Sequence, residues 1–155
     1  MRNHEVVTKQ PLLKEDGSLR EPGWSKSLVQ TYDRKQIKAP RMRIKEWDYY
    51  LVLNEDFAGA FTLSDDGYIG LQSVSLLNFK EGWEHTETIL NPFPMGKFKL
   101  PNTSKEGDII YKDKRLHMAF QIRDGKRRIR CHFKNFYQGK TFSCDIWLEQ
   151  PDMDT

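Results

Sequence analysis

Apolar and polar residues alternate with a period of two along most of the chain from Trp47 to Glu149. Such alternation is typical of β-strands, because successive side chains point to opposite faces of a sheet. The first run predicts a strand over residues 47–53. One face of this strand carries Trp47, Tyr49, Leu51 and Leu53, and the other carries Asp48, Tyr50, Val52 and Asn54.

Similar runs predict further strands over residues 57–63, 69–76, 83–90, 108–111, 116–122, 128–134 and 142–149. Asp124-Gly125 is a preferred sequence for a two-residue type I′ hairpin turn, and Gln138-Gly139 predicts another turn. No segment with helical period separates the runs, and their connections are too short for the crossovers of a parallel sheet. The sequence therefore predicts an antiparallel all-β fold of about eight strands.

An up-and-down meander of eight strands closes most readily as a β-barrel, which holds one small ligand or is packed solid. A β-sandwich is the alternative. Within residues 69–76, Ile69 and Leu71 have one parity and Val74 and Leu76 the other. This change of parity predicts a β-bulge near Gln72.

Residues 1–42 show no sustained period and contain turn signals such as Asp16-Gly17. We expect them to form a leader that packs on the barrel at a few apolar anchors. Residues 43–149 then form the barrel, and residues 150–155 a C-terminal tail.

Composition narrows the classes of partner. The chain has 155 residues, with 25 Lys and Arg against 22 Asp and Glu, and its net charge is +3. This small excess does not indicate binding to nucleic acid or to a membrane surface. No apolar run is long enough for a membrane span, and the polar start lacks the apolar core of a signal peptide. We therefore expect a cytoplasmic protein.

The segment from Arg43 to Tyr50 is the densest group of candidate site residues, with cations, carboxylates and aromatic rings close together. In one interpretation, Glu46 and Asp48 act as an acid and base pair at the barrel mouth, and Lys45 or Arg43 polarises a substrate oxygen. In the other, the rings belong to the core, and the charges meet solvent or hold the leader in place.

A second group is a basic strip of Arg127, Arg128, Arg130, His132 and Lys134. It could bind an anionic head group. Asp145 and Glu149 are placed to face it from the next strand, however, which favours charge pairing on a solvated sheet.

The sequence gives no sign of a metal site or cofactor, because the four histidines (His4, His85, His117 and His132) have no metal-binding spacing. Cys131 and Cys144 are expected nearly opposite each other on neighbouring strands. In a cytoplasmic protein we expect them to be thiols.

Several spaced motifs resemble the family known as domain of unknown function 2804 (DUF2804). They are Leu12-Leu13, Pro22-Gly23-Trp24-Ser25, Tyr32-Asp33-Arg34, Ile37-Lys38-Ala39 and, above all, the segment from Arg43 to Tyr50. Members of that family are usually about twice this long. The resemblance therefore implies an N-terminal half or a truncated member, with residues 150–155 as the start of a missing second half.

The family is also distantly similar to lipocalin-like (calycin-like) two-barrel proteins that include carotenoid hydratases, which would suit a barrel. The Gly-x-Trp signature of true lipocalins is absent: glycine and tryptophan are adjacent in Gly23-Trp24 and Gly82-Trp83.

Three functions follow as hypotheses. The first is a lipocalin-like barrel that binds an apolar small molecule, a lipid or an isoprenoid. The second is a hydratase- or isomerase-like enzyme that uses Glu46 and Asp48. The third is an interaction module whose partner is a second barrel or another copy of the chain. For the first, the expected ligand-contacting residues are Arg43, Lys45, Trp47, Tyr49, Tyr50, Phe61 and Phe120, with Phe133 beside them in the interior.

Overall fold

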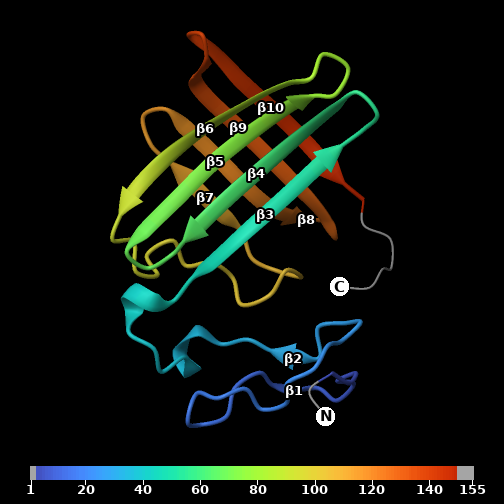
Figure 1. The fold of residues 1–155 in the computed structure, drawn as a ribbon, viewed down its shortest axis with the longest axis vertical. Helices are drawn as coiled ribbons and strands as arrows, with labels where there is room; N and C mark the ends of the chain where they lie inside the picture. Colours follow the sequence, from blue (N-terminus) through green and yellow to red (C-terminus); the bar gives the residue numbers. More distant parts are fainter. Residues whose placement is uncertain (1–2, 150–155) are drawn as a thin grey trace.

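The structure, a computed structural model, describes residues 3–149 and is built on two four-stranded antiparallel sheets (Figure 1). The first sheet contains β3 (Glu46–Leu53), β4 (Phe57–Asp65), β5 (Ile69–Asn78) and β6 (Trp83–Pro92). The second contains β7 (Ile109–Lys112), β8 (Leu116–Arg123), β9 (Lys126–Tyr137) and β10 (Lys140–Leu148). Each sheet is a meander in sequence order, so the antiparallel all-β prediction is confirmed.

Tight turns set the register of the second sheet. Asp124 and Gly125 both have positive φ (53° and 73°), as a type I′ turn requires, and Arg123 pairs directly with Lys126. The hairpin between β9 and β10 places Cys131 directly opposite Cys144, as the sequence predicts.

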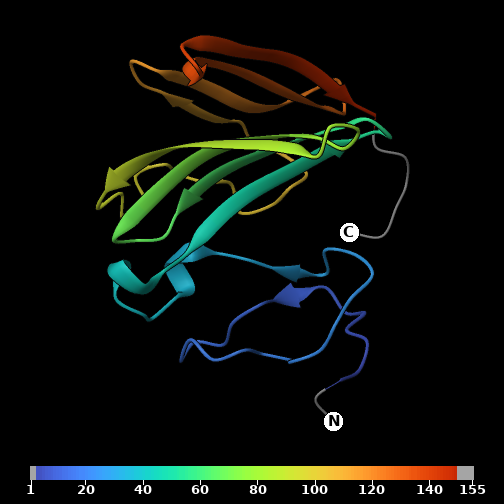
Figure 2. The ribbon, with the colours of Figure 1, turned by 45° about the horizontal axis from the view of Figure 1, so that its top comes forward.

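The two sheets lie face to face, and their strands run crosswise to one another (Figures 1 and 2). Their inner faces form a single core, since every second residue of each strand points inward. Fully buried side chains at its centre are Phe61, Leu63, Val74, Leu116, Met118, Phe120, Ile129 and Phe133.

The predicted closed barrel is wrong for the described residues. β3 pairs only with β4 and β10 only with β9, so the edges of the two sheets remain unpaired. On the other side the chain leaves β6 at Pro92, which has no amide hydrogen for a ladder, and continues with positive φ at Phe93 and Met95. The connection over residues 93–108 then carries the chain to the second sheet. The result is a β-sandwich.

The predicted bulge at Gln72 is also wrong, because both neighbours of β5 pair with it without a register shift. Gln72 lies at an inward position and is fully buried. The side-chain amide of Asn91 donates a hydrogen bond to the side-chain Oε1 of Gln72 and another to the Tyr111 hydroxyl (3.1 Å). A buried glutamine with partners therefore breaks the apolar pattern while the strand stays regular.

Residues 3–42 lie beside one end of the first sheet and do not cover its outer face (Figure 1). They contain β1 (Gln10–Pro11) and β2 (Gln30–Thr31), which pair in parallel, and the short 3-10 helix η1 (Arg34–Gln36). A second 3-10 helix, η2 (Arg41–Arg43), leads into β3. The predicted tail over residues 150–155 lies outside the described residues.

Candidate functional site

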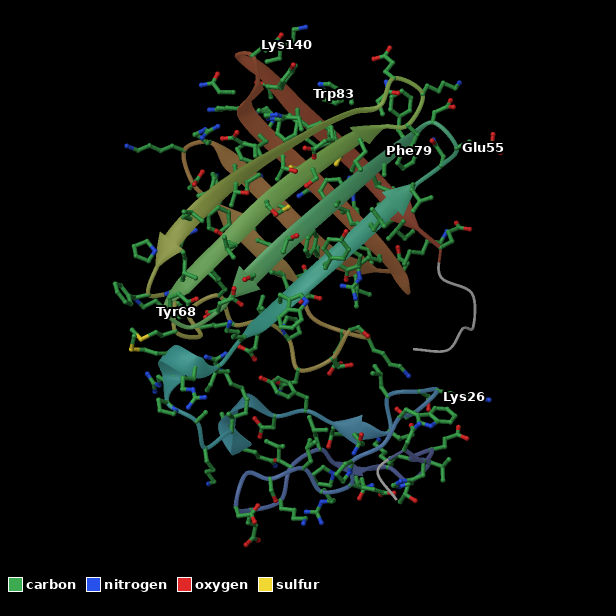
Figure 3. The ribbon with its side chains drawn as sticks, viewed as in Figure 1. Lys26, Glu55, Tyr68, Phe79, Trp83 and Lys140 are labelled. Atoms are coloured by element: carbon green, nitrogen blue, oxygen red, sulfur yellow. The ribbon has the colours of Figure 1, made fainter. Side chains whose placement is uncertain are left out.

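An apolar cavity of about 410 Å³ lies at one end of the sandwich, between the first sheet and β10. Figure 3 labels Glu55, Phe79 and Trp83 at this end, away from Tyr68 at the other end of the first sheet. The side chains that enclose the cavity include Val52, Phe57, Phe61, Leu76, Trp83, Phe142, Cys144 and Ile146. No charged side chain is among the described residues that line it.

Small inward-facing residues on both sheets leave this space open. Gly59 on β4 lies between Val52 and Leu76 on the adjacent strands. A Cβ atom at Gly59 would lie 3.2 Å from the ring of Phe61, so the glycine allows that ring its position. On the second sheet Cys144 also lines the cavity, with a side chain smaller than those of its apolar neighbours. Because protein interiors are otherwise close-packed, small residues at facing positions produce a cavity.

Cys144 is a poor candidate for a nucleophile. Burial raises the pKa of its thiol to about 11 and that of Cys131 to about 12, because the apolar surroundings disfavour the thiolate. Both cysteines are free thiols. At neutral pH they remain protonated, and Cys144 presents a small, weakly polar surface to the cavity.

A second cavity, the leader cavity, has a volume of about 560 Å³ and lies where residues 28–48 approach the loop over residues 100–104. Glu46 connects these segments. Its carboxylate accepts a hydrogen bond from the Tyr32 hydroxyl (2.5 Å) and forms an ion pair with Arg34. Glu46 is therefore engaged in holding the leader against β3.

Asp48 lines the leader cavity on the same strand face as Glu46. Burial raises the pKa of its carboxyl group, and the nearby charge of Arg127 partly opposes this shift. Arg127 is only 5% exposed, and its guanidinium carbon lies 5.5 Å from the ring centroid of Tyr50. Burial also raises the pKa of Tyr50. Asp48 thus lies near a buried guanidinium that donates a hydrogen bond to the backbone carbonyl oxygen of Ser104.

The predicted ligand-contacting residues are only partly brought together: Arg43, Lys45 and Trp47 line the leader cavity, and the others do not. Trp47 and Tyr49 were expected in the interior, and this is wrong: they are 63% and 53% exposed on the outer face of the first sheet. The inward parity of β3 belongs to Asp48, Tyr50 and Val52 instead.

The remaining predicted residues divide between the core and the leader cavity. Phe61, Phe120 and Phe133 are fully buried, and Phe120 contacts the Tyr50 ring edge-on at a centroid distance of 4.7 Å. Arg43 and Lys45 are exposed and line the leader cavity. A ligand-contacting role for this set stays a prediction.

Sequence reasoning missed most of the apolar cavity. Phe142, Cys144 and Ile146 share the inward parity of β10, which the alternation identifies, but their proximity to Val52 depends on how the sheets stack. The one available signal was Gly59, a residue without a side chain at an inward strand position.

Two ion pairs form between charges on the outer face of the second sheet. Arg128 donates to both oxygens of Asp145 (2.7 and 2.5 Å), and Lys126 lies 2.5 Å from Glu149. Arg127 does not belong to this strip, because its parity turns it into the protein. The described residues contain no group of three or more His, Cys, Asp or Glu placed to hold a metal ion.

Comparison with known proteins gives one match. The pattern of the family described as domain of unknown function (DUF2804) covers residues 3–155. The chain belongs to this family. No curated protein and no solved structure matches it. Among the described residues of this DUF2804 chain, no helix is long and apolar enough to cross a membrane.

Proposed function

We propose that this DUF2804 domain binds one uncharged apolar small molecule, of the lipid or isoprenoid class, in the apolar cavity. The observation that carries the proposal is an opening of about 410 Å³ that no charged side chain lines. Small-molecule sites are concave, mostly apolar and typically about 300–1,000 Å³ in volume. A charged ligand would lose its hydration there without finding a partner, so the lining selects against it.

The polar atoms at the rim suit a ligand with one hydroxyl group. Asn54 lines the cavity, and its side-chain oxygen already accepts hydrogen bonds from the backbone of Asp56 and Phe57 (2.9 and 2.8 Å). Its amide nitrogen is thus the part of the side chain that can donate to a ligand oxygen. An isoprenoid alcohol has this combination of an apolar body and one polar end.

Binding of farnesol, a C15 isoprenoid alcohol, tests the proposal. We expect saturable binding of one molecule per chain, measured by isothermal titration calorimetry. Ile146→Asp puts a charge into the cavity and should weaken binding about tenfold or more. Ile110→Asp is the matched control, because Ile110 is exposed on the opposite face of the same sheet and should leave affinity unchanged.

A second readout does not depend on the folding of Ile146→Asp. Bound farnesol should slow the alkylation of Cys144 at pH 9 in the unaltered protein, because this thiol lines the cavity. Saturable binding that leaves the labelling rate of Cys144 unchanged would place the ligand elsewhere. No farnesol binding up to its solubility limit would refute the proposal for isoprenoid alcohols.

One observation favours a second candidate function, acid–base chemistry at the leader cavity. Asp48 has a raised pKa beside Arg127, whereas Glu46 is engaged by Tyr32 and Arg34. Asp48 would then act as the proton donor or acceptor without Glu46 as its partner. Asp48→Asn separates the two functions: farnesol affinity should persist, because Asp48 does not line the apolar cavity, while any hydration or isomerisation that the protein catalyses at the leader cavity should stop.

A further inference from the structure

We propose that a third cavity, the cationic cavity, binds the phosphate groups of a small multivalent anion. It has a volume of about 680 Å³ and lies between residues 34–44 and the loop over residues 95–99. The Phe93 amide donates to the Tyr68 carbonyl oxygen (2.9 Å), which places this loop at the Tyr68 end of the first sheet (Figure 3). The inference is therefore independent of ligand binding in the apolar cavity, at the other end of that sheet. The cations that line the cationic cavity are Arg34, Lys35, Arg41, Lys97 and Lys99.

Four of these five cations have no partner within the described chain. Arg34 forms an ion pair with Glu46, but the side chains of the other four make neither a hydrogen bond nor an ion pair within residues 3–149. Arg128 on the second sheet is different, because Asp145 pairs with it. No carboxylate is among the described residues that line the cationic cavity. Unpaired like charges around one cavity repel each other, so an anion bound among them is favoured.

Two carboxylates beside the cavity bond to its backbone. Asp33 accepts a hydrogen bond from the backbone amide of Lys35 (2.9 Å), and Asp65 accepts one from that of Gly96 (2.7 Å). These bonds hold the two segments that line the cavity. The five cations outnumber these two carboxylates and Glu46 together, so the cavity keeps an excess of positive charge.

The loop that carries Lys97 and Lys99 is held in one conformation by its own backbone. The amide of Lys99 donates to the carbonyl oxygen of Gly96 (3.3 Å), and Met95 and Lys99 have positive φ (47° and 52°). Residues other than glycine adopt this conformation at a cost, and such residues cluster at ligand sites. A Cβ atom at Gly96 would lie 2.9 Å from the guanidinium of Arg34, so the glycine lets the loop pack against that side chain. A fixed loop loses little conformational freedom when a ligand binds.

The hollow shape of the site favours a small molecule over a membrane surface. Its volume of about 680 Å³ lies within the range of about 300–1,000 Å³ that is typical of small-molecule sites. The unpaired cations come from two separate segments, with Lys35 and Arg41 on the leader and Lys97 and Lys99 on the loop. Two segments that meet around a cavity can surround a diphosphate group, and four unpaired cations suit an anion with more than one charge.

Isothermal titration calorimetry of the full 155-residue chain with inorganic pyrophosphate tests the inference. We expect one pyrophosphate per chain, with an affinity that falls as the salt concentration rises. The double substitution of Lys97→Gln with Lys99→Gln removes the cations of the loop and should weaken binding about tenfold. Lys35→Gln with Arg41→Gln removes those of the leader and should weaken binding by a similar factor.

Lys134→Gln with Lys140→Gln is the matched control, because it removes the same charge from two exposed lysines that also have no partner in the described chain. Lys140 lies at the far end of the molecule from the leader (Figure 3). This variant should keep the affinity for pyrophosphate. All the substituted side chains are exposed, so we expect each variant to fold, and circular dichroism checks this.

Four results would overturn the inference. The first is no binding of pyrophosphate at millimolar concentration. The second is an equal loss of affinity in the control, which would show an effect of net charge alone. The third is a loss in only one of the two cavity variants, which would place the anion outside the cavity. The fourth is binding to vesicles of phosphatidylcholine with phosphatidylserine that pyrophosphate does not displace, which would assign the cations to a membrane surface.

Discussion

The two ends of strand β3 contribute to cavities of opposite chemistry. Its first half supplies Glu46 and Asp48 to the leader cavity, where carboxylates meet Tyr32, Arg34 and Arg127. Its last residues supply Val52 and Leu53 to the apolar cavity, which no charged residue lines. The motif that stands out in the sequence thus lies at the polar end. The space best suited to an apolar ligand arises where Gly59 and Cys144 leave the packing incomplete.

The closely packed core between the two cavities gives the largest expected effect. Phe120→Ala should lower the free energy of unfolding by about 3–5 kcal/mol, because it removes a fully buried ring that contacts Tyr50. Urea denaturation measures this change. Leu90→Ala, on the exposed outer face, should cost within about 0.5 kcal/mol. A loss below about 1 kcal/mol for Phe120→Ala would mean that the ring borders open space and that the cavities are continuous.

The attachment of the leader at the polar end of β3 should depend on the hydrogen bond between Tyr32 and Glu46. Tyr32→Phe removes a hydrogen bond to a carboxylate that is also paired with Arg34, and should cost about 1.5–3 kcal/mol. Tyr49→Phe is the matched control, because that ring lies exposed on the outer face and should have almost no effect. Equal effects of the two substitutions in urea denaturation would show that the leader is not held at this point.

Asp108, a charged residue outside both cavities, should affect how the stability of the protein changes at acid pH. Hydrogen bonds from Arg123 lower the pKa of Asp108 to about 2 from its ordinary value of 3.8. A carboxyl group with a lowered pKa stabilises the fold fully above pH 3.8, and this contribution is lost as the pH falls towards 2. Asp108→Asn should therefore destabilise the protein at neutral pH and flatten the loss of stability below pH 3.8. Thermal unfolding across this range measures both effects, and an unchanged acid slope would contradict the assignment.

Asp48 should change the stability of the protein with pH in the opposite direction to Asp108, and by a smaller amount. Burial raises its pKa, so the folded state keeps the proton to a higher pH than the unfolded chain does. Stability then falls as the pH rises above 3.8 through the raised pKa. Asp48→Asn should be more stable than the unaltered protein at pH 7 and equal to it at low pH. Destabilisation at pH 7 would show instead that the Arg127 charge outweighs the cost of burial.

Local chemistry made much of the fold predictable. Alternation placed the strands, the Asp124-Gly125 turn fixed the register of β8 on β9, and the Gln138-Gly139 turn joined β9 to β10, where Cys131 and Cys144 lie opposite each other. Sheet closure was not predictable in this way. It depends on where the long connection over residues 93–108 delivers the chain, and no local pattern encodes that path.

Which face of β3 points into the protein was harder to predict than the position of the strand. Both faces carry aromatic and apolar residues, so periodicity alone could not tell that Tyr50 points inward and Tyr49 outward. The bulge predicted at Gln72 failed for a related reason. The partner of this buried side chain, Asn91, lies on the next strand, and the local pattern of residues cannot indicate it. Cavities likewise depend on distant residues that meet only in the folded chain.

Native mass spectrometry of the protein purified from its expression host tests the proposed function most directly, by comparison of the intact species with the denatured chain. If the account is right, the intact protein carries an added mass that extracts into organic solvent, or binds one farnesol per chain when farnesol is supplied. Ile146→Asp should abolish this added mass, and Ile110→Asp should retain it. A bare chain in both experiments would contradict the account and leave the cavity without the ligand proposed for it.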